Sequence, residues 1–148
     1  MPKIDLIELH MAAAHFPIAL LISSAIFEGL GSWTKKPEFR ITSYWIHLFG
    51  VLTGIGTLLL GVFGNPFFED VGLLGNLFRD YENGMTNRAV QHSWFGLTSL
   101  VVFGLLALWR VKRKDEFAPA ERRFFWASMA IGVAIIGATG YLGAHVMD

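Results

Sequence analysis

Four long apolar segments without a charged residue constrain the fold of this chain most strongly. They are residues 9–27, 44–63, 92–109 and 124–147. Each has about 18 to 24 residues, enough for a helix to cross a hydrocarbon layer roughly 30 Å thick. They lack the period-two alternation of barrel strands, and lipid allows only helices or closed barrels to span it. The sequence therefore predicts an all-α integral membrane protein, an up-down four-helix bundle with spans at about 8–31, 42–63, 88–110 and 123–147.

The whole chain, residues 1–148, is expected to form this one transmembrane domain, with no internal repeat and no linker. The first span is expected to be retained rather than cleaved, because Asp5 and Glu8 accompany Lys3 at the start and no small-residue cleavage motif follows the apolar stretch. Between spans two and three, apolar residues recur at helical spacing, which predicts an interfacial helix at about 70–81 that caps the bundle or serves as a docking surface or lid.

The basic residues predict the orientation in the membrane. Nine of the twelve Lys and Arg lie in two stretches, residues 35–40 and 110–123. Loops rich in these residues usually face the cytoplasm. We therefore expect a bacterial inner-membrane protein with both termini, and the loop at 64–87, on the periplasmic side. No basic patch with interleaved aromatic residues indicates nucleic-acid binding.

The chain contains no cysteine, which excludes disulfides, thiolate ligands, iron–sulfur clusters and covalently attached c-type haem. Any metal or haem would be held by nitrogen, oxygen or thioether groups. We find no nucleophile-and-base pair, no phosphate loop and no paired carboxylates in the spans, so an electron-transfer subunit is favoured over a stand-alone enzyme, and no catalytic residue is proposed.

Histidines are expected to gather at the outer end of the bundle. From the rise of a helix, His15 lies about 10 Å and His92 about 7 Å inside the membrane, with His10 and His145 nearer the surface. A single membrane histidine is usually a hydrogen-bonded structural residue, but four at one end make ligation of haem iron, zinc or copper as well supported as that structural role. His47 is alone at the other end, level with Glu28, the one acid near a span interior, and the two could form a hydrogen-bonded pair.

Small residues accompany the histidines. Ala19 lies one turn from His15 and Gly96 one turn from His92, where a porphyrin would need space. A stripe of small and polar residues in span two indicates a helix-packing groove, a haem slot or both; its members are His47, Gly50, Gly54, Thr57 and Gly61. Pro17 should kink the first span, and the kink could turn His15 inward.

The stretch LHMAAAHFPIAL at residues 9–20 resembles the first helix of a widespread family of bacterial four-helix membrane proteins of unknown function, which typically contains His-Phe-Pro-Ile-Ala-Leu. RAVQHSWFG at 88–96 and GYLGAHV at 140–146 are similar to motifs of the family's third and last helices. Met11 stands where the family has proline, and 61–66 lacks the expected acid. The resemblance implies a four-helix membrane fold and points to His15, His92 and His145, and the proximity of some relatives to cytochrome c domains implies a redox setting.

Two functions remain open from the sequence. In the first, His15 and His92 are axial ligands of a b-type haem, and His10 and His145 are supporting or propionate-binding groups. Electrons would pass between a quinone or a partner's cofactor and a periplasmic acceptor such as cytochrome c, alone or within a larger respiratory complex, as in the small four-helix membrane cytochromes that the chain resembles. In the second, a non-redox structural subunit holds Zn or Cu, or a polar network, with the four histidines His10, His15, His92 and His145.

Overall fold

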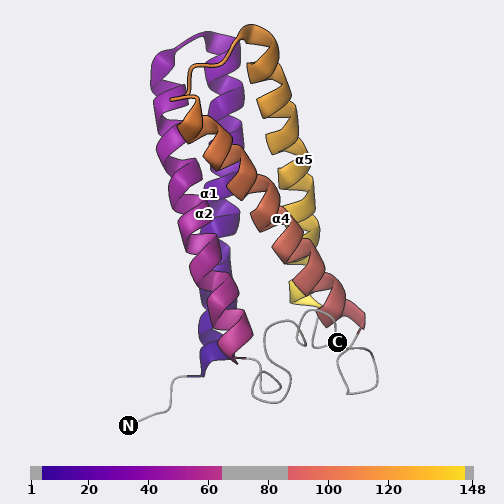
Figure 1. Ribbon diagram of the computed structural model, residues 1–148. Helices are drawn as coiled ribbons and strands as arrows, with labels where there is room; N and C mark the ends of the chain where they lie inside the picture. Colours follow the sequence, from indigo (N-terminus) through magenta and orange to yellow (C-terminus); the bar gives the residue numbers. More distant parts are fainter. Residues whose placement is uncertain (1–4, 65–86, 146–148) are drawn as a thin grey trace.

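The computed structural model describes residues 5–64 and 87–145, which form four α-helices (Figure 1). They are α1 (Leu6–Thr34), α2 (Pro37–Gly64), α4 (Asn87–Lys112) and α5 (Pro119–Ala144). All four are long and apolar enough to cross a membrane, which confirms the predicted all-α membrane bundle. The interfacial helix predicted at about 70–81 lies outside the described residues.

The helices extend beyond the apolar segments because polar residues define their ends. The Asp5 carboxylate accepts a hydrogen bond from the Ile7 N–H at the start of α1. Lys35 ends the helix in the left-handed conformation, and Pro37 opens α2 two residues later. Pro119 similarly opens α5, where the Glu121 carboxylate accepts from the Ala118 N–H at 2.9 Å. Both connections at this end are thus short, and we call it the loop end of the bundle.

The four helices form a ring in which each packs on two neighbours. Helix α1 contacts α2 and α5, and α4 contacts the same two helices, so α1 and α4 lie diagonally opposite. In Figure 1 the α1–α2 hairpin and the α4–α5 hairpin converge at the loop end and spread toward the end that carries both termini. We call that second end the terminal end.

Residues facing the bundle interior recur at alternating intervals of three and four, the spacing that lets neighbouring helices interdigitate. On α1 the buried stripe is Pro17, Leu21, Ser24, Glu28 and Gly31. On α5 it is Phe125, Met129, Gly132, Ile136 and Thr139. On α2 it includes Ser43, His47, Gly50 and Thr57. On α4 it includes Ser99, Phe103, Leu106 and Arg110.

The small-residue stripe of α2 is a packing groove. A Cβ at Gly50 would lie 2.7 Å from a methyl group of Leu21, and one at Gly54 would lie 3.0 Å from Leu100. The adjoining helices therefore occupy the space that these glycines leave, which confirms the packing interpretation of the stripe.

A network of ion pairs and hydrogen bonds joins all four helices at the loop end. The fully buried guanidinium of Arg110 contacts the fully buried carboxylate of Glu28 at 2.6 Å, and Arg122 contacts its other oxygen at 2.8 Å. Arg110 also binds Asp115 at 2.8 Å and the hydroxyl of Ser43 at 3.0 Å. A buried charge is tolerated when it is paired and hydrogen-bonded, and Glu28 and Arg110 meet both conditions.

We predict that Glu28→Ala strongly destabilises the bundle, by about 3 to 5 kcal/mol, because it leaves Arg110 buried without its principal partner. Arg113→Ala is the matched control, since it removes an exposed ion pair with Glu121 at the same end and should change stability little. Thermal unfolding in mild detergent compares the two variants with wild type. Equal, small effects would show that the Glu28–Arg110 contact does not hold the helices together.

Candidate histidine site

Two histidines from diagonally opposite helices meet in the terminal half of the bundle. The rings of His10 on α1 and His92 on α4 have centroids 6.2 Å apart and planes at 87°. His10 Nδ1 lies 2.8 Å from the carbonyl oxygen of Thr57 on α2, and His92 Nδ1 lies 2.9 Å from that of Thr139 on α5. Each ring is thus held by the neighbouring helix of its own hairpin.

These hydrogen bonds select the tautomer of both rings. A carbonyl oxygen only accepts, so Nδ1 must carry the proton in each ring. In a neutral imidazole the other nitrogen, Nε2, then keeps its lone pair. Donation of the non-ligating N–H to a carbonyl is the arrangement commonly found around histidines that bind metals. His10 and His92 both have this arrangement.

Glycines one turn beyond the two threonines make room for the rings. A Cβ at Gly61 would lie 2.8 Å from the His10 ring, and one at Gly143 would lie 2.9 Å from the His92 ring. Both imidazoles therefore lie against bare backbone of the adjacent helix. A side chain as small as alanine at either glycine would push the ring away.

The two halves of the site are copies of one pattern. His92, Thr139 and Gly143 each lie 82 residues after His10, Thr57 and Gly61, respectively, and both histidines lie 47 residues before the threonine they contact. The same interval relates further pairs of residues: Pro37 with Pro119, Arg40 with Arg122, Gly50 with Gly132, and Glu28 with its partner Arg110.

The expectation of no internal repeat was therefore wrong. Few residues are identical between the hairpins, but they include the histidines, threonines and glycines of the site and the glycines at positions 50 and 132, where helices pack closely. Because α1 and α4 run in the same direction, the repeat relates the hairpins by an approximate two-fold axis along the bundle. His10 meets His92 near this axis in one half of the bundle, and Glu28 meets Arg110 near it in the other.

His15 does not face His92, and the expected facing pair of these two residues is corrected to His10 and His92. Helix α1 continues through Pro17, whose side chain is buried. Two residues correspond to about 200° around a helix, so an inward Pro17 turns His15 outward. His10 precedes Pro17 by seven residues, about two turns, and shares its inner face. The His15 ring is exposed, and among the described residues its hydrogen bond is with the Met11 carbonyl of its own helix.

The small residues chosen from the sequence are also placed differently. Ala19 is exposed, because it lies two residues beyond Pro17. Gly96 is half-buried and packs on α5, since a Cβ there would lie 3.4 Å from a Thr139 methyl group. Neither residue opens a slot beside a histidine. The room at this site comes from Gly61 and Gly143 instead.

The four outer histidines do not assemble into one cluster. His145 contacts the Tyr141 carbonyl one turn earlier on its own helix, and its ring lies 4.5 Å from the Tyr141 ring. Within residues 5–64 and 87–145, no three His, Asp or Glu side chains come together in a way that could hold a metal ion. The closed site of four histidines for Zn or Cu is therefore not formed.

Arg110 is the residue that sequence reasoning missed at the other end. It was counted with the loop cations, whereas it lies inside α4 and is fully buried against Glu28. His47 is not hydrogen-bonded to Glu28 as expected; its Nε2 contacts the Phe103 carbonyl at 3.0 Å. The informative signal was Glu28 itself, because a lone acid in a membrane span requires a cationic partner.

No curated protein and no solved structure matches the chain. A family match extends over residues 7–148 and thus includes all four helices and both histidines of the pair. The chain belongs to the family described as "Predicted membrane protein (DUF2231)", which carries no assigned function.

Proposed function

We propose that the chain is a haem b-binding membrane subunit that transfers electrons, with His10 and His92 as the axial ligands of the iron. The observation that carries this proposal is the shared state of the two rings. Each donates Nδ1–H to a backbone carbonyl, and within residues 5–64 and 87–145 no hydrogen bond engages Nε2. Haem iron, when bound, supplies the one-electron chemistry.

The separation of the rings suits a shared metal ion. His10 and His92 would hold such an ion jointly, because their rings lie close together across the bundle. The observed centroid separation is 6.2 Å. The approximate two-fold relation of the hairpins also supports a ligand with two equivalent attachments, because His10 and His92 have equivalent surroundings.

The interior of the terminal half supports a bulky planar guest. The apolar core cluster lies toward the loop end, and its outermost members are Leu21, Phe103 and Ile136. Beyond them the buried side chains of the described helices are small or polar, such as Thr57 and Thr139. The two hairpins are also spread apart at this end (Figure 1), so we propose that the planar group would enter between them.

The chain's own residues would orient the ligands and control their surroundings. The carbonyls of Thr57 and Thr139 hold the rings and increase the basicity of Nε2 through the Nδ1 hydrogen bonds. These are the means by which a protein adjusts the potential of a bis-histidine haem.

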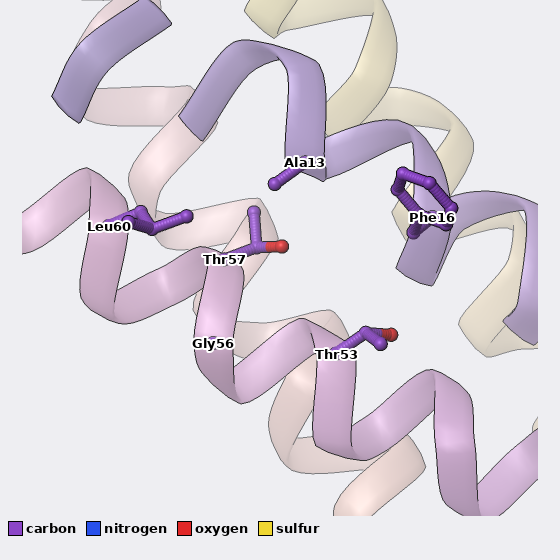
Figure 2. Close-up of a pocket in the computed structure, with 6 residues that line it drawn as sticks. All are labelled: Ala13, Phe16, Thr53, Gly56, Thr57 and Leu60. Atoms are coloured by element: carbon purple, nitrogen blue, oxygen red, sulfur yellow. The ribbon is translucent and has the colours of Figure 1, made fainter. Parts of the chain in front are cut away.

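A groove between α1 and α2 offers a route for the electron donor or acceptor. It has a volume of about 440 Å³ and is lined by Ala13, Phe16, Thr53, Gly56, Thr57 and Leu60 (Figure 2). Thr57 belongs to both the groove and the histidine site. A quinone that diffuses in the bilayer could lie here, with Thr57 between it and His10. The acceptor would then be a cytochrome c or a respiratory complex at the terminal end.

A second candidate is a structural subunit in which the histidines form a polar network without metal. The favouring observation is that all five histidine rings already contact backbone carbonyls. In this function the His10–His92 contact would fasten the two hairpins together. The two candidate functions differ in whether the Nε2 atoms of His10 and His92 bind a metal.

Haem binding is tested by reduced-minus-oxidised spectra of protein prepared with haem supplied. We expect a Soret band in wild type, loss of low-spin haem in His10→Ala and His92→Ala, and retention in His15→Ala, the matched control on the outer face of α1. Loss in His15→Ala with retention in His10→Ala would refute the assigned pair. If wild-type protein shows no Soret band, the haem proposal is wrong and the structural function is the remaining candidate.

The orientation proposed from the basic loops is tested in the same cysteine-free background. We expect Asp5→Cys, at the terminal end, to react with a membrane-impermeant maleimide in intact bacterial cells. Lys36→Cys, in the short loop between α1 and α2, should react only after the membrane is permeabilised. The reverse pattern would place the histidine pair on the cytoplasmic side and exclude a periplasmic acceptor.

A further inference from the structure

A pocket at the loop end is lined by three arginines and no acid. It has a volume of about 380 Å³ and lies where α1, α2 and α5 meet; its lining residues are Ser32, Arg40, Phe117, Pro119, Arg122, Arg123 and Trp126. The pocket is on the other half of the bundle from the histidine pair, and nothing in the proposed electron transfer uses it.

Two of the three guanidinium groups have no partner within the described residues. Arg122 is engaged with Glu28 and with the Asp115 carbonyl. The side chains of Arg40 and Arg123 make no hydrogen bond or ion pair with residues 5–64 and 87–145. The Nε atom of Arg40 is buried even so, and its N–H is left without an acceptor. A buried N–H of a charged group requires an acceptor, so a ligand with anionic oxygens is indicated.

The backbone is shaped to hold these side chains. A Cβ at Gly31 would lie 2.7 Å from Cγ of Arg40, so the glycine lets the arginine stem lie flat on α1. A Cβ at Gly29 would lie 2.8 Å from Nε1 of Trp126, so the indole also lies against bare backbone. Arg40 and Trp126 are therefore brought to the pocket from α2 and α5 across the surface of α1.

We propose that this pocket binds the phosphate group of an anionic phospholipid in the leaflet at the loop end. Guanidinium groups bind phosphate oxygens in pairs of parallel hydrogen bonds. Basic pockets between membrane helices are known to accept lipid headgroups. The apolar lining from Phe117, Pro119 and Trp126 suits the glycerol and upper acyl region, and an indole is typical of the interface depth.

The local charge favours an anionic lipid over a zwitterionic one. At the loop end, residues 35–40 and 110–123 carry nine Lys and Arg against four acids, with Glu28 as a fifth acid nearby. Glu28 and Asp115 are already occupied by Arg110 and Arg122. A lipid with net negative charge offsets part of the positive charge of Arg40 and Arg123. This proposal does not rest on haem binding.

Native mass spectrometry of the detergent-solubilised full chain tests the site. Titration with phosphatidylglycerol should show one tight binding event, with phosphatidylcholine bound at least about tenfold more weakly. Arg40→Gln combined with Arg123→Gln should weaken phosphatidylglycerol binding by about tenfold or more. Lys112→Gln, at the same end but outside the pocket, should leave it unchanged. Arg123→Gln alone removes an exposed residue, so it tests the site even if the double variant folds poorly.

Inorganic phosphate forms the second arm of the experiment. Millimolar phosphate should compete only weakly, because it lacks the glycerol and acyl contacts. If inorganic phosphate binds through Arg40 and Arg123 as tightly as the lipid does, the pocket is a soluble-anion site and the lipid assignment is overturned. If Lys112→Gln weakens lipid binding as much as the pocket variants do, the attraction is general to the basic loops and the pocket is not a site.

Discussion

Polar groups between membrane helices must find their partners inside the protein, because the surrounding lipid offers none. In this bundle the Glu28 carboxylate takes hydrogen bonds from Arg110 and Arg122 and also from Ser43, so every one of the contacts comes from another helix. Those contacts hold the two hairpins together at the loop end. The apolar core adjoins the network, with Phe125 lying under the Arg110 guanidinium at 5.1 Å from the ring centroid. Because these contacts fix the loop end, the buried side chains of the terminal half can be smaller and more polar, and its hairpins can lie farther apart.

The approximate repeat explains why the His10–His92 contact and the Glu28–Arg110 ion pair both lie near the bundle axis. A two-fold axis brings equivalent positions of α1 and α4 together, so residues 82 apart meet across it. In one half the equivalent residues are alike, as His10 and His92, and in the other they have opposite charges, as Glu28 and Arg110. The two opposite charges form an ion pair that holds the hairpins together, whereas the two imidazoles are the pair that we propose as ligands. The differences between the two hairpin sequences thus distinguish a structural end from the end that carries the proposed site.

Hydropathy predicted the four spans well, because length and lack of charge are properties of each segment alone. The pairing of histidines was predicted less well, because it depends on rotation about the helix as well as on depth. His15 was at a suitable depth but on the wrong face. The spacing of Pro17, Ser24 and Gly31 could have indicated the inner face, and His10 continues that spacing. Arg110 was missed for a related reason: its charge suggested a loop, although Glu28 on the diagonally opposite helix required a buried cation. The hydrogen bonds to Thr57 and Thr139 carbonyls could not be predicted, since any backbone offers a carbonyl at every residue.

The central claim is that His10 and His92 are held as Nδ1–H tautomers with free Nε2 lone pairs, and nitrogen-15 NMR tests it most directly. Protein without haem, labelled at histidine nitrogens and studied in detergent micelles, would report the tautomer of each ring, with assignments from His10→Gln and His92→Gln. The structure predicts a protonated Nδ1 and an unprotonated Nε2 for both rings. A protonated Nε2 at either ring in the neutral protein would contradict the account, because that ring would have no lone pair to offer.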